Sequence, residues 1–315
     1  MKKILICGAS GFIGRNVFKF LTATNEFEVH GTCLNNEHLH PHLKKVDLIN
    51  RRSVKEITKG YDCVINAAAI TAGSGAVAAN PHRYITDNLL INSHLTEAVH
   101  ENNVGQFIFL SCTVMYPSSD RPLAESEYDL SALHPRYRMG ARLKVFGEDL
   151  CRFYAGLEKT RYTSIRHSNV YGPYDKFDLE KAHVFGATVT KVMTSDGKVV
   201  VWGNGQEQRN LLHVHDLVRF IRMVIDGQDY PYDVFNVGSS TCVSVQELTE
   251  KIIAVSGRNL SIVYDQSRPS IDISIQISSK KAEKKFGWKS KINLDAGIKT
   301  TLDWYRQLAK QLPIR

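Results

Sequence analysis

The sequence lacks the features of several large protein classes. No apolar run approaches the roughly 20 residues that a transmembrane helix requires, since candidates such as Cys63–Ile70 and Phe107–Leu110 are only strand-sized. The six cysteines are irregularly spaced and form no CxxC motif, which excludes zinc ribbons and disulfide scaffolds. We therefore expect reduced thiols, no metal site, no membrane insertion and a cytoplasmic location.

The charge of the chain narrows the range of partners. Lysine and arginine number 40 against 32 acidic residues, a net charge of +8, which suits an anionic partner. Only Lys280–Lys285 forms a basic cluster, which we interpret as a solvated helix face, and no nucleic-acid partner is expected. The first residues resemble a signal peptide, but Gly8, Gly11 and Gly14 interrupt the apolar run, so no leader is expected.

Strand-like and helix-like segments alternate along the first half of the chain. This alternation indicates βαβ units with right-handed crossovers, hence an α/β fold with a Rossmann-type doubly wound parallel sheet. The predicted strands are Lys3–Cys7, Phe27–Leu34, Tyr61–Ala68, Gln106–Leu110 and Tyr162–Arg166, and the predicted helices are Asn16–Thr22, Pro81–Asn102 and Tyr137–Leu157.

The pattern changes after about residue 171, where glycine, proline and polar residues become more frequent. Ser244 and Glu247 form a capping box that predicts a helix over Ser244–Ser256. We predict a dinucleotide-binding domain over residues 1–170 and a smaller mixed α/β substrate-binding domain over residues 171–315. No clean linker separates them, so the two are expected to interleave, with residues near 211–238 returning to the first domain.

A glycine-rich turn follows the first predicted strand and opens the first helix. Gly8 permits the tight turn, Gly11 lets the backbone approach a pyrophosphate, and Gly14 lets helix and strand pack closely. The helix N-terminus then presents free N–H groups to the anion. The spacing is GxxGxxG rather than GxGxxG, and its strand–turn–helix context predicts dinucleotide binding. The predicted contacts in this turn are Gly8, Ser10, Gly11, Phe12, Ile13 and Gly14.

The choice between NAD and NADP depends on the end of the second strand. An acidic residue there normally binds the ribose of NAD, whereas an arginine accommodates the phosphate of NADP. Here the strand ends in Leu34-Asn35-Asn36, with neither residue type present. The missing arginine favours NAD, with Asn35 as a ribose contact. Asp47 and Leu48 are candidates to flank the adenine, and the alternative for Asp47 is a turn carboxylate.

Motifs along nearly the whole chain carry a family resemblance. They are Gly8–Gly14, Asn66–Ala69, Asn88, Leu110–Pro117, Lys144 with Glu148, Asn169–Pro173, Ala182–Val184, Val200–Gly205, Arg209 with Leu212–Val214, Phe235–Gly238 and Phe286–Trp288. Together they resemble the extended short-chain dehydrogenase/reductases, within them the GDP-L-fucose synthase branch. The resemblance implies a cofactor on the N-terminal domain, a nucleotide-linked sugar against the smaller domain, and hydride transfer at sugar C4.

The sequence departs from this family at the active site. The family pairs a tyrosine and a lysine in a YxxxK motif, and Lys144 occupies the lysine position, where the resemblance implies that it anchors the nicotinamide ribose. Four residues earlier stands Gly140 instead of tyrosine. The family's strand serine is replaced by Cys112, which Thr113 follows. Loss of a positioned general base typically lowers the rate by about 10²–10⁴-fold.

Several groups are candidates to replace the tyrosine as proton acceptor. Tyr137 lies one helical turn before Gly140, although a packing role is the simpler interpretation. His183 matches a histidine of the family's substrate loop, and Cys112 and Thr113 lie on the strand. A water admitted beside Gly140 is a further candidate, and we favour the water or Thr113.

The fucose synthase branch also isomerises C3 and C5 with a cysteine and a histidine. His183 matches that histidine, but Val114 stands where the cysteine belongs, and an apolar side chain cannot transfer a proton. Epimerisation at C3 or C5 is therefore not expected.

The resemblance assigns further binding residues. Trp202 can stack on a base, with core packing as the alternative, and Arg209 suits a pyrophosphate. GDP is implied by the branch rather than by a base-reading residue. The remaining cofactor contacts that it implies are Ala67, Ala68, Ala69, Asn88 and Lys144. The substrate contacts that it implies are Asn169, His183, Trp202, Arg209 and Lys280.

Three functions follow from these motifs. The first is NAD-dependent hydride transfer at C4 of a GDP-linked, manno-configured hexose or heptose, as a 4-dehydrogenase or 4-keto reductase. In lacking the tyrosine, the chain resembles GDP-manno-heptose 4-dehydrogenases. The alternatives are an inactive relative that retains its dinucleotide and a nucleotide-sugar 4-epimerase. The helices Pro81–Asn102 and Tyr137–Leu157 resemble those of the family's dimer interface, so a homodimer or a dimer of dimers is expected.

Overall fold

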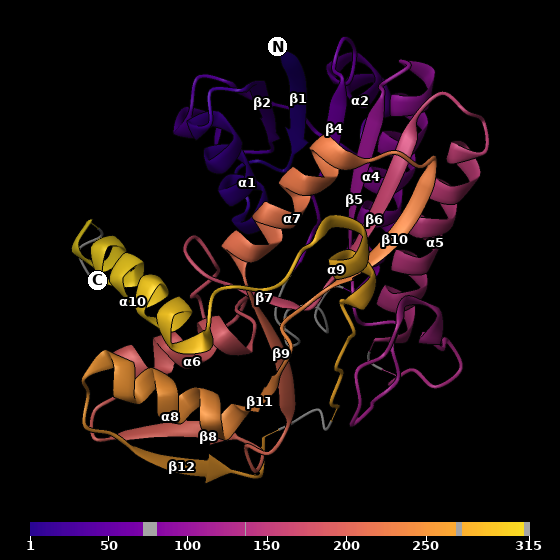
Figure 1. The fold of residues 1–315 in the computed structure, drawn as a ribbon. Helices are drawn as coiled ribbons and strands as arrows, with labels where there is room; N and C mark the ends of the chain where they lie inside the picture. Colours follow the sequence, from indigo (N-terminus) through magenta and orange to yellow (C-terminus); the bar gives the residue numbers. More distant parts are fainter. Residues whose placement is uncertain (72–80, 136, 269–272, 312–315) are drawn as a thin grey trace.

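A seven-stranded parallel sheet forms the centre of the molecule (Figure 1). The computed structural model describes residues 1–71, 81–135, 137–268 and 273–311. The strand order β10-β6-β5-β4-β1-β2-β3 reverses at β1, which confirms the doubly wound Rossmann-type sheet. Its strands are β1 (Lys2–Cys7), β2 (Phe27–Cys33), β3 (Leu43–Lys45), β4 (Cys63–Asn66), β5 (Gln106–Cys112), β6 (Arg161–His167) and β10 (Tyr232–Val237).

Helices cover both faces of this sheet, so its strands are apolar on both sides. In β1, Ile4 and Ile6 belong to the hydrophobic cluster beneath α1 (Phe12–Ala23) and α7 (Val214–Gly227). Leu5 and Cys7 belong to the cluster on the opposite face. The helices on that face are α2 (Arg51–Ile57), α4 (Pro81–Glu101) and α5 (Arg138–Ala155).

A smaller part of the molecule lies at the carboxyl ends of the large sheet's strands (Figure 1). One sheet joins β7 (Asn169–Tyr171), β9 (Gln208–His213) and β11 (Cys242–Ser244), and a second pairs β8 (Lys198–Trp202) with β12 (Ser261–Asp265). They share a core with α6 (Val184–Thr194), α8 (Val245–Ser256) and α10 (Leu294–Gln311). The predicted capping box is present, since Ser244 Oγ accepts from Glu247 N at 3.0 Å and Glu247 Oε2 accepts from Ser244 N at 2.8 Å. The described ranges also contain the short elements η1 (Glu37–Leu39), η2 (Glu125–Glu127) and α9 (Lys280–Phe286).

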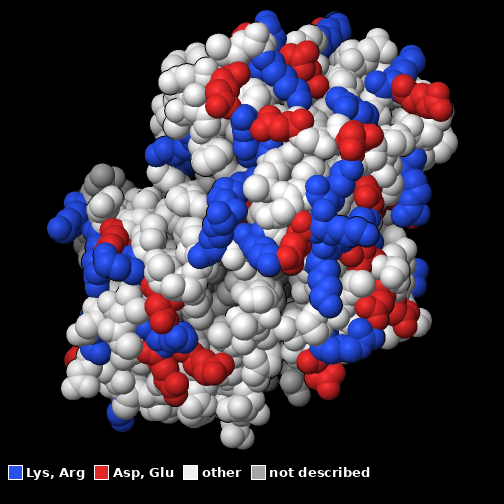
Figure 2. All heavy atoms as spheres, viewed as in Figure 1, with Lys and Arg blue, Asp and Glu red and all other residues white. Residues whose placement is uncertain are grey.

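Two of the four lysines in the basic cluster at α9 form ion pairs. Lys281 pairs with Asp233 and Lys285 pairs with Asp229. Figure 2 shows basic and acidic side chains interspersed across this face of the molecule. The arrangement is that of a solvated helix face. Within the described ranges, no helix is long and apolar enough to cross a bilayer.

Asp216 connects α7 to the segment between α9 and α10. Its side chain is fully buried. Oδ2 accepts the backbone N–H groups of Lys291 and Ile292 at 3.0 and 2.9 Å, and Oδ1 pairs with Arg219 at 2.5 Å. The Asp216 carbonyl also accepts from the indole of Trp288 at 3.0 Å. One buried carboxylate therefore satisfies two backbone donors and pairs with the cation of Arg219.

We expect Asp216→Ala to lower the free energy of unfolding by about 3 kcal/mol, because breaking a buried ion pair leaves its partners unsatisfied. Chemical denaturation followed by circular dichroism measures this change. Asp226→Ala on the same helix is the matched control, because the Asp226–Arg222 pair is half-exposed and exposed pairs contribute little. Equal losses in the two variants would contradict the structural role of Asp216.

Candidate active site

The glycine turn between β1 and α1 can be built only from glycine at two positions. Gly8 has a φ of 80°, and a Cβ there would lie 2.7 Å from Ala68 Cα. A Cβ on Gly14 would lie 2.2 Å from the carbonyl oxygen of Gly8. The turn is held by Gly8 N donating to Thr32 Oγ1 at 3.1 Å and by Gly11 N donating to Gly8 O at 3.0 Å. Helix and strand are thus drawn together as the glycine spacing predicts.

The N-terminus of α1 is open to an anion. Gly11 is the N-cap residue and is exposed, and no side chain caps the helix. No acidic residue lies in its first turn. The free N–H groups and the positive end of the helix dipole therefore fit the pyrophosphate of a dinucleotide. Ser10, Phe12 and Ile13 are half-buried in the same turn.

Asn88 organises the loop that follows β4. Its Oδ1 accepts from Ile70 N at 2.9 Å, and its Nδ2 donates to Ile70 O at 3.0 Å and to Tyr84 O at 2.6 Å. This double contact holds the predicted cofactor residues Ala67–Ala69 beside the glycine turn, where Ala67 N donates to Cys7 O at 3.0 Å. The side-chain amide of Asn88 forms its hydrogen bonds with the backbone of Ile70 and Tyr84. A direct contact between Asn88 and the cofactor stays a prediction.

The end of β2 exposes Asn35 and Asn36 beside the exposed lysines of β3. Lys44 and Lys45 pair in register with Thr32 and Cys33. Asp47 Oδ1 accepts from Ile49 N at 3.0 Å, which is the turn-carboxylate geometry considered above. Leu48 is buried in the hydrophobic core. The adenine contacts of Asp47 and Leu48 stay predictions.

Lys144 and Gly140 lie on α5 beside the end of β5. Lys144 Nζ donates to Leu110 O at 2.8 Å. A Cβ placed on Gly140 would meet no atom within 4 Å, so the family's tyrosine position is open space. Burial raises the pKa of the Cys112 thiol, and the positive charge of Lys144 offsets only part of the rise. Thr113 is 8% exposed.

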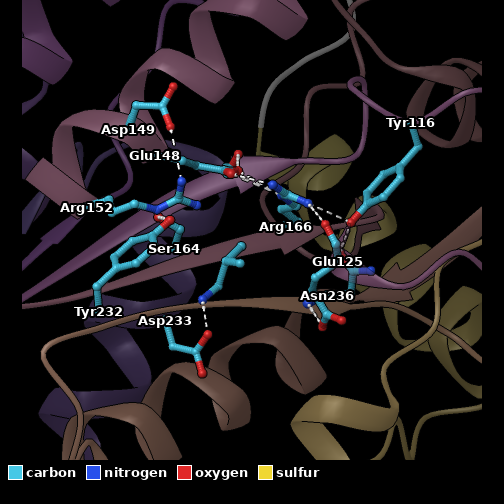
Figure 3. Close-up of polar contacts among 12 residues, drawn as sticks. Tyr116, Glu125, Glu148, Asp149, Arg152, Ser164, Arg166, Tyr232, Asp233 and Asn236 are labelled. Atoms are coloured by element: carbon cyan, nitrogen blue, oxygen red, sulfur yellow. Dashed lines mark hydrogen bonds and ion pairs between the residues drawn. The ribbon is translucent and has the colours of Figure 1, made fainter. Parts of the chain in front are cut away.

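A buried ion pair between Arg166 of β6 and Glu148 of α5 joins these two elements (Figure 3). The side chains of Arg166 and Glu148 are 2% and 3% exposed. Arg166 donates from Nη2 to Glu148 Oε2 at 2.6 Å and from Nε to Glu148 Oε1 at 3.0 Å. Glu148 Oε1 also accepts from Ser111 Oγ at 2.6 Å. Desolvation alone would lower the pKa of Arg166, but the hydrogen bonds and charge of Glu148 raise it overall, so the guanidinium stays charged.

The remaining donors of Arg166 extend this network. Nη1 donates to Tyr116 Oη at 2.9 Å and to Glu125 O at 2.7 Å. Tyr116 Oη donates to Asn236 Oδ1 at 2.7 Å, and Asn236 N donates to Glu125 Oε1 at 2.8 Å. The network joins β5, β6, β10, α5 and η2, as Figure 3 shows.

Sequence reasoning missed the polar residues at the end of β6, Arg166 and His167. His167 lies closest to the reacting groups by strand register. It pairs in register with Cys112 at the end of β5. Its Nδ1 lies 2.9 Å from Ser168 O. The pKa of His167 is lowered to about 4, mainly by burial and also by the nearby Lys144 and His183, against the opposing effect of the Ser168 contact. The available signal was its place two residues before the family motif that begins at Asn169.

The predicted substrate residues lie on β7, β8, β9 and the N-termini of α6 and α9. Asn169 Nδ2 donates to Asn210 O at 3.3 Å, and Arg209 Nη1 donates to Ile273 O at 3.0 Å. Trp202 is 45% exposed rather than packed in the core, and Lys191 Nζ and Arg268 Cζ lie 4.8 and 5.6 Å from the centroid of its ring. Its stacking on a base stays a prediction. His183 is the N-cap residue of α6. Lys280 is exposed at the start of α9, seven residues after Ile273, whose carbonyl accepts from Arg209.

The described ranges contain no group of three or more histidine, cysteine, aspartate or glutamate side chains placed to hold a metal ion.

Residues 4–238 match the NAD dependent epimerase/dehydratase family. The chain belongs to this family. GDP-L-colitose synthase from Yersinia pseudotuberculosis is 26% identical over 311 residues, covering 96% of this chain and 97% of that protein. GDP-L-fucose synthase 1 from Arabidopsis thaliana is 31% identical over 248 residues, covering 77% and 76%. These similarities confirm the GDP-L-fucose synthase branch.

The family membership agrees with the fold. The structure of UDP-glucose 4-epimerase from Thermotoga maritima matches with a TM-score of 0.85 at 24% identity, covering 97% of this chain and 99% of that one. At this identity the match shows a shared architecture.

We expect Gly11→Leu to abolish dinucleotide binding, measured by bound cofactor and by fluorescence titration, with little change in thermal stability. The reason is that a Cβ at Gly11 would meet only Gly8 O, at 3.3 Å, while the longer side chain would occupy the exposed helix N-terminus. Gly14→Ala is the comparison variant, since its Cβ must displace the backbone of Gly8 and should lower stability as well. Unchanged cofactor content in Gly11→Leu would refute the placement of the pyrophosphate.

Proposed function

We propose that this protein is an NAD-dependent oxidoreductase that transfers a hydride at C4 of a GDP-linked, manno-configured hexose or heptose. It would act as a 4-dehydrogenase or a 4-keto reductase. The observation that carries this proposal is Lys144, held at the end of β5 one helical turn after the open position of Gly140. The names of the GDP-L-colitose and GDP-L-fucose synthase relatives support the GDP-sugar class.

The cofactor is assigned to the edge of the sheet formed by β1, β2 and β4. The Gly8–Gly14 turn would bind the pyrophosphate, Asn35 the ribose, and the loop Ala67–Ala69 the nicotinamide half. NAD is favoured over NADP because β2 is followed by Asn35 and Asn36 and by no arginine. Bound NAD supplies an acceptor for the hydride. The residues of the chain bind and orient the cofactor and the sugar, and they accept the proton.

The proton at the C4 hydroxyl is assigned to a relay rather than to a tyrosine. Lys144 would hold the nicotinamide ribose, and its positive charge favours a negative charge developing on the sugar oxygen. Thr113 and a water beside Gly140 would pass the proton on. The raised pKa of Cys112 keeps this thiol protonated, so it serves at most as a hydrogen-bond donor. Val114 at the epimerase cysteine position argues against inversion at C3 or C5.

The substrate is assigned to the face of the smaller part that meets the large sheet. Trp202 would stack on the nucleotide base, Arg209 and Lys280 would bind phosphates, and Asn169 and His183 would contact the sugar. This assignment divides the chain into a cofactor domain, residues 1–170 with a segment near 211–238, and a substrate domain within 171–315. The pairing of β10 with β6 and the packing of α7 under the large sheet support the returning segment.

The apolar face of α5 supports a homodimer or a dimer of dimers. Met139, Phe146 and Phe153 recur every seven residues and so lie on one side of the helix. They are 57%, 47% and 63% exposed. α5 packs along α4, and together the two helices offer a surface that a second copy would cover.

The direct test incubates the purified protein with GDP-mannose-type hexoses or heptoses and NAD. Reduced nicotinamide is followed by absorbance and the sugar by mass, and binding of NADH and NADPH is compared by titration. The proposal expects a mass loss of two hydrogens from the sugar, matched by NADH, and tighter binding of NADH. Retained cofactor with an isomerised sugar of unchanged mass would indicate a 4-epimerase, and a bound dinucleotide without any reaction would indicate an inactive relative.

If the relay carries the proton, Thr113→Val should lower kcat by roughly tenfold or more, a loss within the range of acid–base catalysis. It should change KM little, because the substrate phosphates are bound elsewhere. Tyr137→Phe is the matched control and should have little effect, since Tyr137 precedes α5 and its ring lies against His134. The reverse result, with Tyr137→Phe inactive and Thr113→Val unchanged, would show that the tyrosine function has moved one helical turn.

A further inference from the structure

A relay through Thr113 and water needs a base at its end, since a threonine hydroxyl and water are much weaker bases than a neutral imidazole. His167 is placed to be that base. Cys112 and His167 lie opposite each other on neighbouring parallel strands, so their side chains project from the same face of the sheet about 5 Å apart. Cys112 occupies the position at which the family carries its active-site serine. His167 is therefore at the reaction centre rather than behind it.

The hydrogen bond of His167 fixes which nitrogen is free. Ser168 O can only accept, so the contact of 2.9 Å assigns the proton to Nδ1. In a neutral imidazole the other nitrogen, Nε2, then carries a lone pair. The ring is half-buried and is not tied to a carboxylate, because no ion pair involving His167 occurs among the described residues. The orientation is that of a general base held by a backbone carbonyl.

Burial keeps the His167 ring neutral, and the charges around it act in the same direction. Lys144 reaches it from α5, His183 from the N-terminus of α6, and the Cys112 thiol faces it from β5. Lys144 is cationic and His183 can become so. Among the described residues, no carboxylate acts on the ring to favour its protonation. With the pKa of His167 lowered to about 4 by burial, Lys144 and His183, the base form is the resting form near pH 7.

We propose that Nε2 of His167 accepts the proton that the missing tyrosine would otherwise take, an inference that rests on the proposed function. In the oxidation, the O–H bond at C4 breaks and its electron pair forms the second bond of the C4 carbonyl. The hydride leaves C4 with its electron pair for oxidised NAD, the oxidant. The proton reaches Nε2 directly or through the water and Thr113, which leaves an imidazolium. In the reduction the imidazolium returns this proton to the C4 oxygen.

The first test does not depend on turnover. ¹⁵N NMR of the histidine rings, with His167 assigned through the His167→Gln variant, reports the tautomer and the pH at which the ring becomes charged. The inference expects an Nδ1–H tautomer that protonates near pH 4 in the protein without substrate. An Nε2–H tautomer, or a ring that is already charged at pH 7, would overturn it.

The second test separates this inference from the proposed function. If the wild-type enzyme turns over, His167→Gln should lower kcat at neutral pH by about 10²–10⁴-fold. The Kd for GDP-sugar should stay within about twofold of the wild-type value, and the melting temperature within about 2 °C. Its residual rate should rise with pH, because hydroxide then replaces the base. Adding Gly140→Tyr to the His167→Gln variant should raise kcat at least tenfold, since Gly140 leaves room for a tyrosine four residues before Lys144.

The outcomes are distinct. A wild-type kcat and pH profile in His167→Gln would overturn the role of His167 and leave the proposed function standing. Loss of GDP-sugar binding together with kcat would show that His167 is structural, which also overturns it. A wild-type protein that oxidises or reduces no GDP-sugar would refute the proposed function, and the assignment of His167 would fall with it.

Discussion

The buried ion pair between Arg166 and Glu148 is the contact on which the geometry of the site depends. Two charges removed from water are stable only when their hydrogen-bonding groups are satisfied. Here Ser111, Tyr116 and the carbonyl of Glu125 supply those partners. The pair thereby fixes the relative positions of β5, β6 and α5, which come from distant parts of the sequence.

The candidate active-site residues are neighbours of this network along the chain. His167 directly follows Arg166, Cys112 directly follows Ser111, and Lys144 lies one helical turn before Glu148. A side chain that must act within hydrogen-bond reach of a substrate needs such support, because small displacements are sufficient to lose catalysis. The network therefore explains how the site keeps a defined shape although its tyrosine position is empty space. A proton acceptor on β6 can work there because its strand is anchored by the adjacent arginine.

Much of the fold was predictable from local patterns. The apolar runs of β1, β4 and β5 and the glycine turn identify the doubly wound sheet, and the capping box of Ser244 and Glu247 correctly marks α8. The helix α1 begins at Phe12 rather than Asn16, because the glycine turn itself forms the helix start. β3, α2, α6, α7 and α10 were not predicted, since short or mixed-polarity segments acquire their structure from tertiary packing.

The site was less predictable than the fold. The family motifs lead to Lys144, Gly140 and Cys112, which the structure brings together. They do not lead to His167, because a lone histidine in an apolar strand is more often a packed residue than a base. Its neighbours in space, Lys144 and His183, are 23 and 16 residues away along the chain, and only the strand register shows its relation to Cys112.

The most direct measurement is a crystal structure of the protein with NAD and a GDP-linked manno-configured sugar. The account predicts the pyrophosphate at the Gly8–Gly14 turn, Lys144 on the nicotinamide ribose, and the C4 oxygen within hydrogen-bond reach of His167 Nε2, directly or through one water beside Gly140. A C4 oxygen bound instead by the phenol of Tyr137, or a sugar turned away from β5 and β6, would contradict it.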